Sequence, residues 1–198
     1  MKRMRMIVFH LLLLLIGGII YCYEHDLYLS KKKCIEDYLN SSYLDYECFY
    51  ELSHVDYSHW NPGRSFIEIV ADDKDGGRFL SISLIKKGPF YTIGSMSEYA
   101  IFNNHSFELV MRYRYSQINR MYIVIYRHDE RISFIEGELE NGDVIYFDQW
   151  QGNYSVGILE ERNKIDLVRY RAFDVNGNLI EEVFADQIGA YNLIDRIE

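Results

Sequence analysis

The sequence predicts a mainly β fold: an antiparallel meander forming a sandwich or a partly closed barrel, with an N-terminal membrane helix and a short helical lead-in. From Phe107 to Tyr115, large apolar side chains alternate with mostly charged ones, which is the period of a strand with one buried face. Similar runs continue to Trp150, separated by short polar or turn-forming segments. The 18 tyrosines, 11 phenylalanines and only 2 prolines also favour strands.

Strand patterns extend on both sides of this central stretch. Residues 66–71 and 79–85 flank a turn of aspartates and glycines, so they predict a first hairpin. Residues 91–104 fit one or two short strands or a helical turn. The remaining predicted strands are residues 107–115, 121–126, 132–139, 144–147, 154–159, 166–175 and 178–184.

Two Asn-Gly pairs mark the clearest turns. Asn141-Gly142 lies within the meander, and Asn176-Gly177 joins the last two predicted strands. Asn-Gly favours a two-residue type I′ turn, because both central residues of that turn need positive φ. In the last hairpin such a turn predicts the pairs Tyr170 with Val183, Arg171 with Glu182 and Phe173 with Ile180.

The N-terminus reads as a membrane-targeting segment. Lys2, Arg3 and Arg5 precede residues 7–23, which are almost entirely apolar. This stretch is near the lower length limit for a membrane-spanning helix. No A-x-A cleavage pattern follows it, so an uncleaved anchor is favoured over a cleaved signal peptide. The basic start predicts that the rest of the chain lies outside the cytoplasm, although the lysines at 31–33 weigh against that orientation.

The chain is therefore divided into three parts. Residues 1–23 form the anchor or signal peptide, residues 24–64 a helical lead-in and loop, and residues 65–198 an antiparallel β domain. Ser30 is the expected N-cap of the first lead-in helix. The spacing of Leu44, Cys48 and Leu52 predicts a second helix. Residues 190–197 are expected to form a short C-terminal helix.

The net charge of the chain limits the kinds of partner that it is expected to bind. The formal net charge is −9, and all 30 acidic residues follow Tyr23. Because three basic residues precede that point, the remainder of the chain has a formal charge of −12. An acidic body argues against nucleic acid as the main partner and favours a basic protein, or it simply keeps the protein soluble.

Four arginines are the candidate ligand-binding residues. Arg112 with Arg114, and Arg169 with Arg171, each share one side of a predicted strand. If the two strands share a face, four guanidiniums could bind an anion or a carboxylate. The simpler interpretation, which we favour, is salt bridging, for instance across the last hairpin.

Other constellations are weaker. Glu136 and Glu138 share a strand face and could act as an acid and a base, although a solvated face is the favoured interpretation. His54, Asp56 and His59 lie in one predicted loop without the spacing of a helical zinc site. No catalytic residue, metal site or cofactor is predicted. Cys34 and Cys48 could form one disulfide, or remain two small buried thiols.

These features predict a membrane-tethered, extracytoplasmic, acidic binding module. One version of it is an inhibitor or immunity-type protein for a basic protein partner. Two alternatives remain open. An envelope hydrolase would use the paired carboxylates, and a structural subunit of an envelope assembly would use an exposed sheet edge.

Overall fold

The computed structural model describes residues 2–42, 46–56, 64–73, 78–101, 104–115, 120–160, 166–188 and 193–195. The helices of this part are α1 (Lys2–Glu24) and α2 (Lys31–Ser42). The strands are β1 (Tyr46–Asp56), β2 (Arg64–Asp73), β3 (Arg78–Lys87), β4 (Phe90–Ala100), β5 (Phe107–Tyr115), β6 (Arg120–Arg127), β7 (Phe134–Leu139), β8 (Val144–Phe147), β9 (Trp150–Gln151), β10 (Tyr154–Glu160), β11 (Leu167–Phe173), β12 (Leu179–Phe184) and β13 (Leu193–Asp195).

The described strands form three sheets, which we name A, B and C. Sheet A has the order β1-β2-β3-β4, sheet B the order β13-β5-β6-β10-β9, and sheet C the order β12-β11-β7-β8. All neighbours pair antiparallel except β13, which runs parallel to β5. The predicted fold class is confirmed, because the chain is mainly β in antiparallel, sandwich-like sheets. None of these sheets closes into a barrel.

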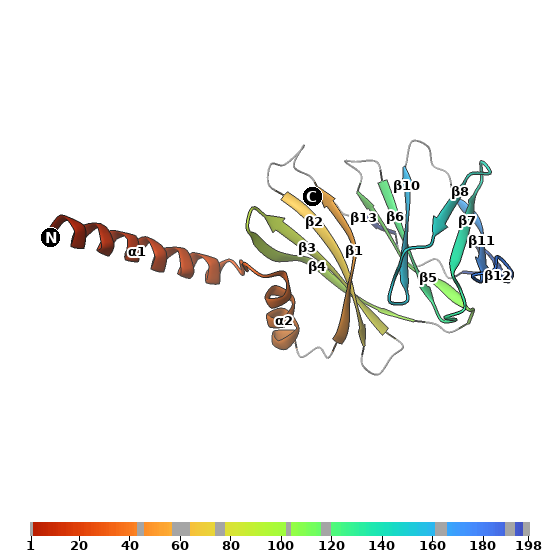
Figure 1. The fold of residues 1–198 in the computed structure, drawn as a ribbon, viewed down its shortest axis with the longest axis horizontal. Coiled ribbons are helices and arrows are strands. Elements are labelled where there is room, and N and C mark those ends of the chain that lie inside the picture. The colour runs from red at the N-terminus through yellow and green to blue at the C-terminus, as the bar shows by residue number, and fades with distance from the viewer. Residues whose placement is uncertain are drawn as a thin grey trace.

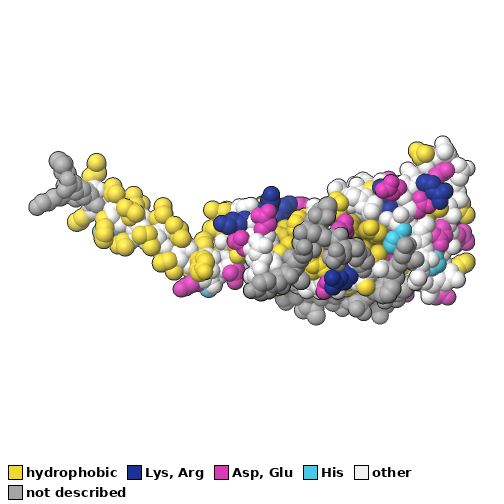
Figure 2. Space-filling view, turned by 90° about the horizontal axis from the view of Figure 1, so that it is seen from below, with side chains coloured by type: hydrophobic (Ala, Val, Ile, Leu, Met, Phe, Trp, Pro, Cys, Tyr) yellow, Lys and Arg dark blue, Asp and Glu magenta, His cyan; other side chains and the backbone are white. Residues whose placement is uncertain are grey.

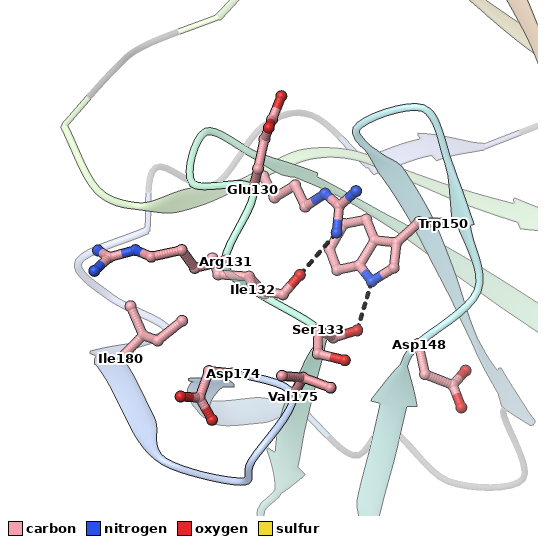
Figure 3. Close-up of a pocket in the computed structure, with 10 residues that line it drawn as sticks. Glu130, Arg131, Ile132, Ser133, Asp148, Trp150, Asp174, Val175 and Ile180 are labelled. Carbon is pink, nitrogen blue, oxygen red and sulfur yellow. Dashed lines mark hydrogen bonds between the residues drawn. The ribbon is translucent and has the colours of Figure 1, made fainter.

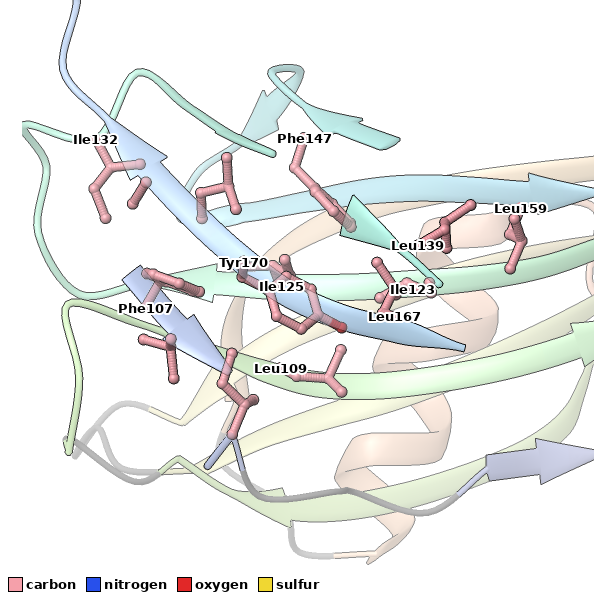
Figure 4. Packing of buried hydrophobic residues seen from close by; sticks show 14 of the residues in the cluster. Phe107, Leu109, Ile123, Ile125, Ile132, Leu139, Phe147, Leu159, Leu167 and Tyr170 are labelled. Carbon is pink, nitrogen blue, oxygen red and sulfur yellow. The ribbon is translucent and has the colours of Figure 1, made fainter. Parts of the chain in front are cut away.

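The elements stack in layers along the molecule (Figure 1). One apolar cluster, which includes Cys34, Ile35 and Ile82, lies between α2 and sheet A. A second cluster, with Phe79 and Val124, joins sheet A to sheet B. The third joins sheet B to sheet C, and Figure 4 shows its packing. Sheets A and B are thus covered on both faces, whereas no apolar cluster of the described residues lies on the outer face of sheet C.

Helix α1 stands apart from these layers and points away from the sheets (Figure 1). Its described apolar side chains, such as Leu11 and Ile19, are exposed. The segment Met6–Glu24 is long and apolar enough to cross a membrane. The prediction of a separate apolar helix at residues 7–23 is therefore confirmed, and it fits a signal anchor or a membrane span.

The predicted meander is wrong at one junction. Strand β6 pairs with β5 and β10 in sheet B, whereas β7 pairs with β11 and β8 in sheet C. The physical reason lies in the burial patterns. Residues 121–125 of β6 are buried without alternation, which requires cover on both faces, whereas β7 alternates between buried and partly exposed residues. A strand that is buried on both faces and a strand that is buried on one face therefore belong to different sheets.

Two predicted helices are wrong. Residues 46–56 form β1, whose Tyr50, Leu52 and Val55 pack against the cluster between sheets A and B. The four-residue spacing that suggested a helix is overridden by this pairing, since tyrosine and valine suit a half-buried strand. At the C-terminus, Leu193–Asp195 is β13 and adds a parallel edge to β5. The ambiguous residues after Phe90 form the long strand β4.

The Asn-Gly turns have another geometry than predicted. Gly142 and Gly177 have positive φ, of 85° and 79°, but the asparagine before each does not. The amide of Gly177 donates to the carbonyl of Asp174 at 3.0 Å, so the turn begins earlier than a type I′ turn would. The different turn changes the register of the hairpin next to it, so Phe173 lies opposite Leu179 rather than Ile180. An irregularity after Ala172 restores the predicted pairs Arg171–Glu182 and Tyr170–Val183.

Candidate binding face on sheet C

The outer face of sheet C brings together side chains from four strands. The register of β11 places Arg169 between Phe184 and Glu138, and Arg171 between Glu182 and Glu136. Strand β8 extends these rows, with Val144 beside Glu138 and Tyr146 beside Glu136. Residues two apart on a strand share a face, so the two rows lie side by side. We call these eight residues the C face: Glu136, Glu138, Val144, Tyr146, Arg169, Arg171, Glu182 and Phe184.

Ion pairs connect the centre of the C face. Arg169 Nε donates to Glu138 Oε2 at 3.0 Å, and Arg169 Nη1 lies 3.6 Å from Glu182 Oε1. Arg171 Nη2 lies 3.1 Å from Glu136 Oε2 and 3.8 Å from Glu138 Oε2. Two guanidiniums therefore share three carboxylates in one network. These side chains are partly exposed, so their pairing is screened by water and salt.

This network bears on both predicted sites. The hydrogen bond from Arg169 holds the pKa of Glu138 below its usual range, and the same bond raises the pKa of Arg169. A carboxylate with a lowered pKa stays ionised at neutral pH, which is unfavourable for a general acid. Arg169 and Arg171 likewise have their charge matched by glutamates of the same face.

Apolar side chains border the network. Tyr146 is 55% exposed on one side of the C face, and Phe184 is 50% exposed on the other. Beyond the row of Arg171, the rings of Phe134 and Phe173 stack with centroids 4.9 Å apart. The face therefore combines an ion-pair centre with exposed aromatic side chains at its margins.

The other two candidate arginines lie elsewhere. Arg112 belongs to β5 in sheet B and lies near Tyr170, inside the B–C sandwich. Burial raises the pKa of the Tyr170 phenol, and the charge of Arg112 opposes that rise. Arg112 and Arg169 thus do not share a sheet face. The backbone of Arg114 also belongs to β5, but its side chain lies outside the described residues. A ligand role for the four arginines stays a prediction.

The cysteines and the His-Asp-His group, which the sequence also singled out, do not form a site among the described residues. Cys34 lies on the buried face of α2, and burial raises the pKa of its thiol to about 11. The side chain of Cys48 is outside the described residues, so a disulfide between the two stays a prediction. The side chains of His54, Asp56 and His59 are outside them too. No group of three metal-ligating side chains occurs among the residues that the structure does describe.

A pocket of about 580 Å³ opens at the ends of β7 and β11, beside the Phe134–Phe173 pair. The Arg127 guanidinium lies 4.4 Å from the centre of the Trp150 ring and donates to the carbonyl of Ile132 at 2.7 Å. Trp150 Nε1 donates to the carbonyl of Ser133, also at 2.7 Å (Figure 3). Other lining residues are Glu130, Arg131, Asp148, Asp174, Val175 and Ile180.

A contact that the sequence did not predict attaches strand β12 to the loop before β5. Glu181 accepts hydrogen bonds from His105 Nδ1 at 2.8 Å and from the Ser106 amide at 2.7 Å, and it also accepts one from the Ser106 hydroxyl. Burial raises the pKa of Glu181, but the bonds from Ser106 and His105 outweigh it, so the pKa is lowered overall. These residues are far apart in sequence, and no local pattern could have indicated the contact.

Acidic charge is concentrated in the same half of the molecule. Residues 127–188 contain 14 Asp and Glu but 6 Lys and Arg, a formal charge of −8, whereas residues 24–126 contain 14 and 11, a formal charge of −3. Figure 2 shows acidic and basic side chains side by side at the end of the molecule opposite α1. Most of the negative charge thus lies in the part of the sequence that contains the strands of sheet C.

Comparison of the chain with models of protein families, with curated proteins and with solved structures finds no match.

Proposed function

We propose that this chain is a membrane-tethered, extracytoplasmic binding module whose C face binds a basic protein. The observation that supports this most is the contrast between the sheets. Sheets A and B are covered on both faces, whereas sheet C presents a broad face to solvent at the end of the molecule opposite α1 (Figure 1). A tethered domain would hold this face away from the membrane.

The make-up of the C face suits a protein partner. Aromatic residues and arginine are enriched in protein interfaces and supply most of their hot spots. Tyr146 and Phe184 would provide apolar contacts, while Arg169 and Arg171 are already held by their glutamates. Guanidiniums fixed in this way lose little further side-chain entropy on binding.

The charge of this half supports a basic partner. A formal charge of −8 over residues 127–188 would steer a cationic protein toward the face and repel acidic ones. Three carboxylates line the neighbouring pocket against two guanidiniums, so its net charge is negative and would favour a lysine or arginine side chain of the partner. An inhibitor or immunity-type protein that blocks a basic toxin or enzyme is one form of this function.

The test uses the full-length chain in its native membranes. A photoreactive amino acid is placed at Tyr146 on the C face, and a matched one at Phe49, which is 41% exposed in sheet A. We expect Tyr146 to cross-link a protein of positive net charge that Phe49 does not reach. The purified partner should bind roughly tenfold more weakly when the salt is raised from about 50 to about 200 mM.

Two results would reject the proposal. Equal cross-linking of the same proteins from Tyr146 and Phe49 would show that the C face has no special role. An affinity that does not depend on salt would remove the basis for a basic partner.

A further inference from the structure

The junction between α1 and the sheets contains a groove with a volume of about 750 Å³. On one side it is lined by α1 from Leu15 to Tyr23, a length of roughly 12 Å at 1.5 Å per residue. On the other side lie Leu29 and Phe90, the latter at the start of β4. The groove thus runs along the helix that would cross the membrane and ends at the base of the globular part.

This junction is short and hydrogen-bonded. Only residues 25–30 connect α1 to α2, and Asp26 turns the chain with a positive φ of 48°. Tyr28 exchanges two backbone hydrogen bonds with Tyr91 of β4, at 2.7 and 2.9 Å. The base of the sheets is therefore fixed close to the end of α1, so a bilayer that holds α1 would meet this base directly.

Apolar side chains are exposed at this base. Leu29 is 73% exposed, and Tyr21 and Tyr23 are exposed at the last turns of α1. Tyrosine is enriched where a membrane helix meets the headgroups. An exposed leucine in the same position would lie in the same layer, where its transfer out of water is favourable.

Charged groups in the groove match a lipid headgroup. Three lysines, at 31–33, occupy the first turn of α2, where they oppose the helix dipole. Lys31 pairs with Glu51 and Lys32 with Glu36, whereas Lys33 has no such pair among the described residues and lines the groove. A phosphate beside Lys33 would offset the unfavourable interaction between the three lysines and the helix dipole. Asp26 and Asp37 line the groove as well, and would favour an ammonium group.

We infer that this groove holds a phospholipid of the surrounding bilayer whose headgroup carries both a phosphate and an ammonium group. The acyl chains lie along Leu15 and Ile19, and the headgroup lies among Lys33, Asp26 and Asp37. This inference rests on the anchor part of the proposed function. It adds that the base of the sheets lies on the leaflet, so the domain does not hang on a free tether and the C face points away from the membrane.

The experiment places a photoreactive diazirine amino acid at Leu29, in the full-length chain reconstituted into vesicles of equal parts phosphatidylethanolamine and phosphatidylglycerol. Val175 is the matched exposed control at the far end, where it is 83% exposed, and Leu12 is the control within α1. We expect Leu29 to give at least about five times more lipid adduct than Val175, since the latter lies far from the bilayer. The Leu29 adducts should favour phosphatidylethanolamine, and the Leu12 adducts should show no preference.

Each other outcome overturns a stated part. Adducts at Leu12 but not at Leu29 reject the lipid groove and leave the anchor standing. Loss of adducts at both positions rejects the anchor as well. A preference of Leu29 for phosphatidylglycerol rejects the paired phosphate and ammonium groups. A cross-link from Leu29 to a second copy of the chain, in place of lipid, shows that protein covers the groove.

Discussion

Sheets A and C differ in how much of each is buried. Strand β3 of sheet A buries residues 79–84 without interruption, because α2 covers one face and sheet B the other. Strand β11 of sheet C alternates, with Tyr170 and Ala172 buried and Arg169 and Arg171 partly exposed. The comparison supports the division of roles that we propose, in which sheet A contributes stability and sheet C carries the binding face.

The largest expected effect tests the buried side of this division. Phe79 is fully buried between sheets A and B and stacks on Tyr99 with centroids 5.0 Å apart. Phe79→Ala should lower the free energy of unfolding by about 3–5 kcal/mol, because it leaves a cavity between two layers. Urea unfolding of the full-length chain in detergent measures this. A loss below about 1 kcal/mol would mean that the A–B interface is loosely packed.

The contact between sheets B and C can be tested by adding atoms. A Cβ at Gly157 would lie 2.5 Å from the ring of Phe147, whereas a Cβ at Gly137 would meet the end of the flexible Leu167 side chain at 2.7 Å. Gly157→Ala should therefore destabilise the fold by about 1–3 kcal/mol, and Gly137→Ala by less. The same unfolding measurement compares them. The reverse order would show that β8 does not pack on β10 as described.

A pH-dependent effect is expected where sheet C is joined to the loop before β5. The pKa of Glu181 is lowered in the folded state, so its contribution to stability is present above the unfolded value of about 4.3 and is lost as the pH falls through the folded value. Glu181→Gln should destabilise the protein at neutral pH. The gap in melting temperature between wild type and this variant should shrink below about pH 4. A gap that is constant with pH would contradict the account.

The smallest effect concerns the C face itself. Arg171→Ala should cost about 1 kcal/mol or less, because its ion pair with Glu136 is partly exposed. A double-mutant cycle with Glu136→Gln measures the coupling between the two residues. A loss as large as that of Phe79→Ala would mean that the C face is a structural element, and would weaken the contrast between the sheets.

Most of the strands could be predicted from the sequence, but the sheet to which each strand belongs could not. The residues from Leu167 to Phe173 were predicted as a strand, with a turn at the Asn-Gly pair after it, whereas the alternation of buried and exposed residues along this strand comes from the structure. The layer to which each strand belongs depends on partners distant in sequence, as with β6 and β10. The unbroken apolar run at residues 121–125 did contain the signal, since a strand buried on both faces has no alternation.

The candidate site was predictable only in part. The pairing of Arg171 with Glu182 was predicted from a two-residue turn, and the structure has it because the irregularity after Ala172 offsets the different turn. The pairing of Arg169 with Glu138 brings β11 next to β7, across a long stretch of chain, and no local rule predicts it. The Glu181 contact with Ser106 depends in the same way on how sheet C folds onto sheet B. Which of the predicted charged residues form ion pairs therefore depends on strand pairing between segments that are distant in sequence.

The most direct test of the central claim compares two aromatic truncations in binding to the cross-linked partner. Tyr146→Ala removes an exposed ring from the C face, and Phe49→Ala removes a similarly exposed one from sheet A. The account predicts that Kd rises about tenfold or more for Tyr146→Ala and less than about twofold for Phe49→Ala, with both variants folded. Equal effects, or a larger effect at Phe49, would contradict the assignment of binding to sheet C.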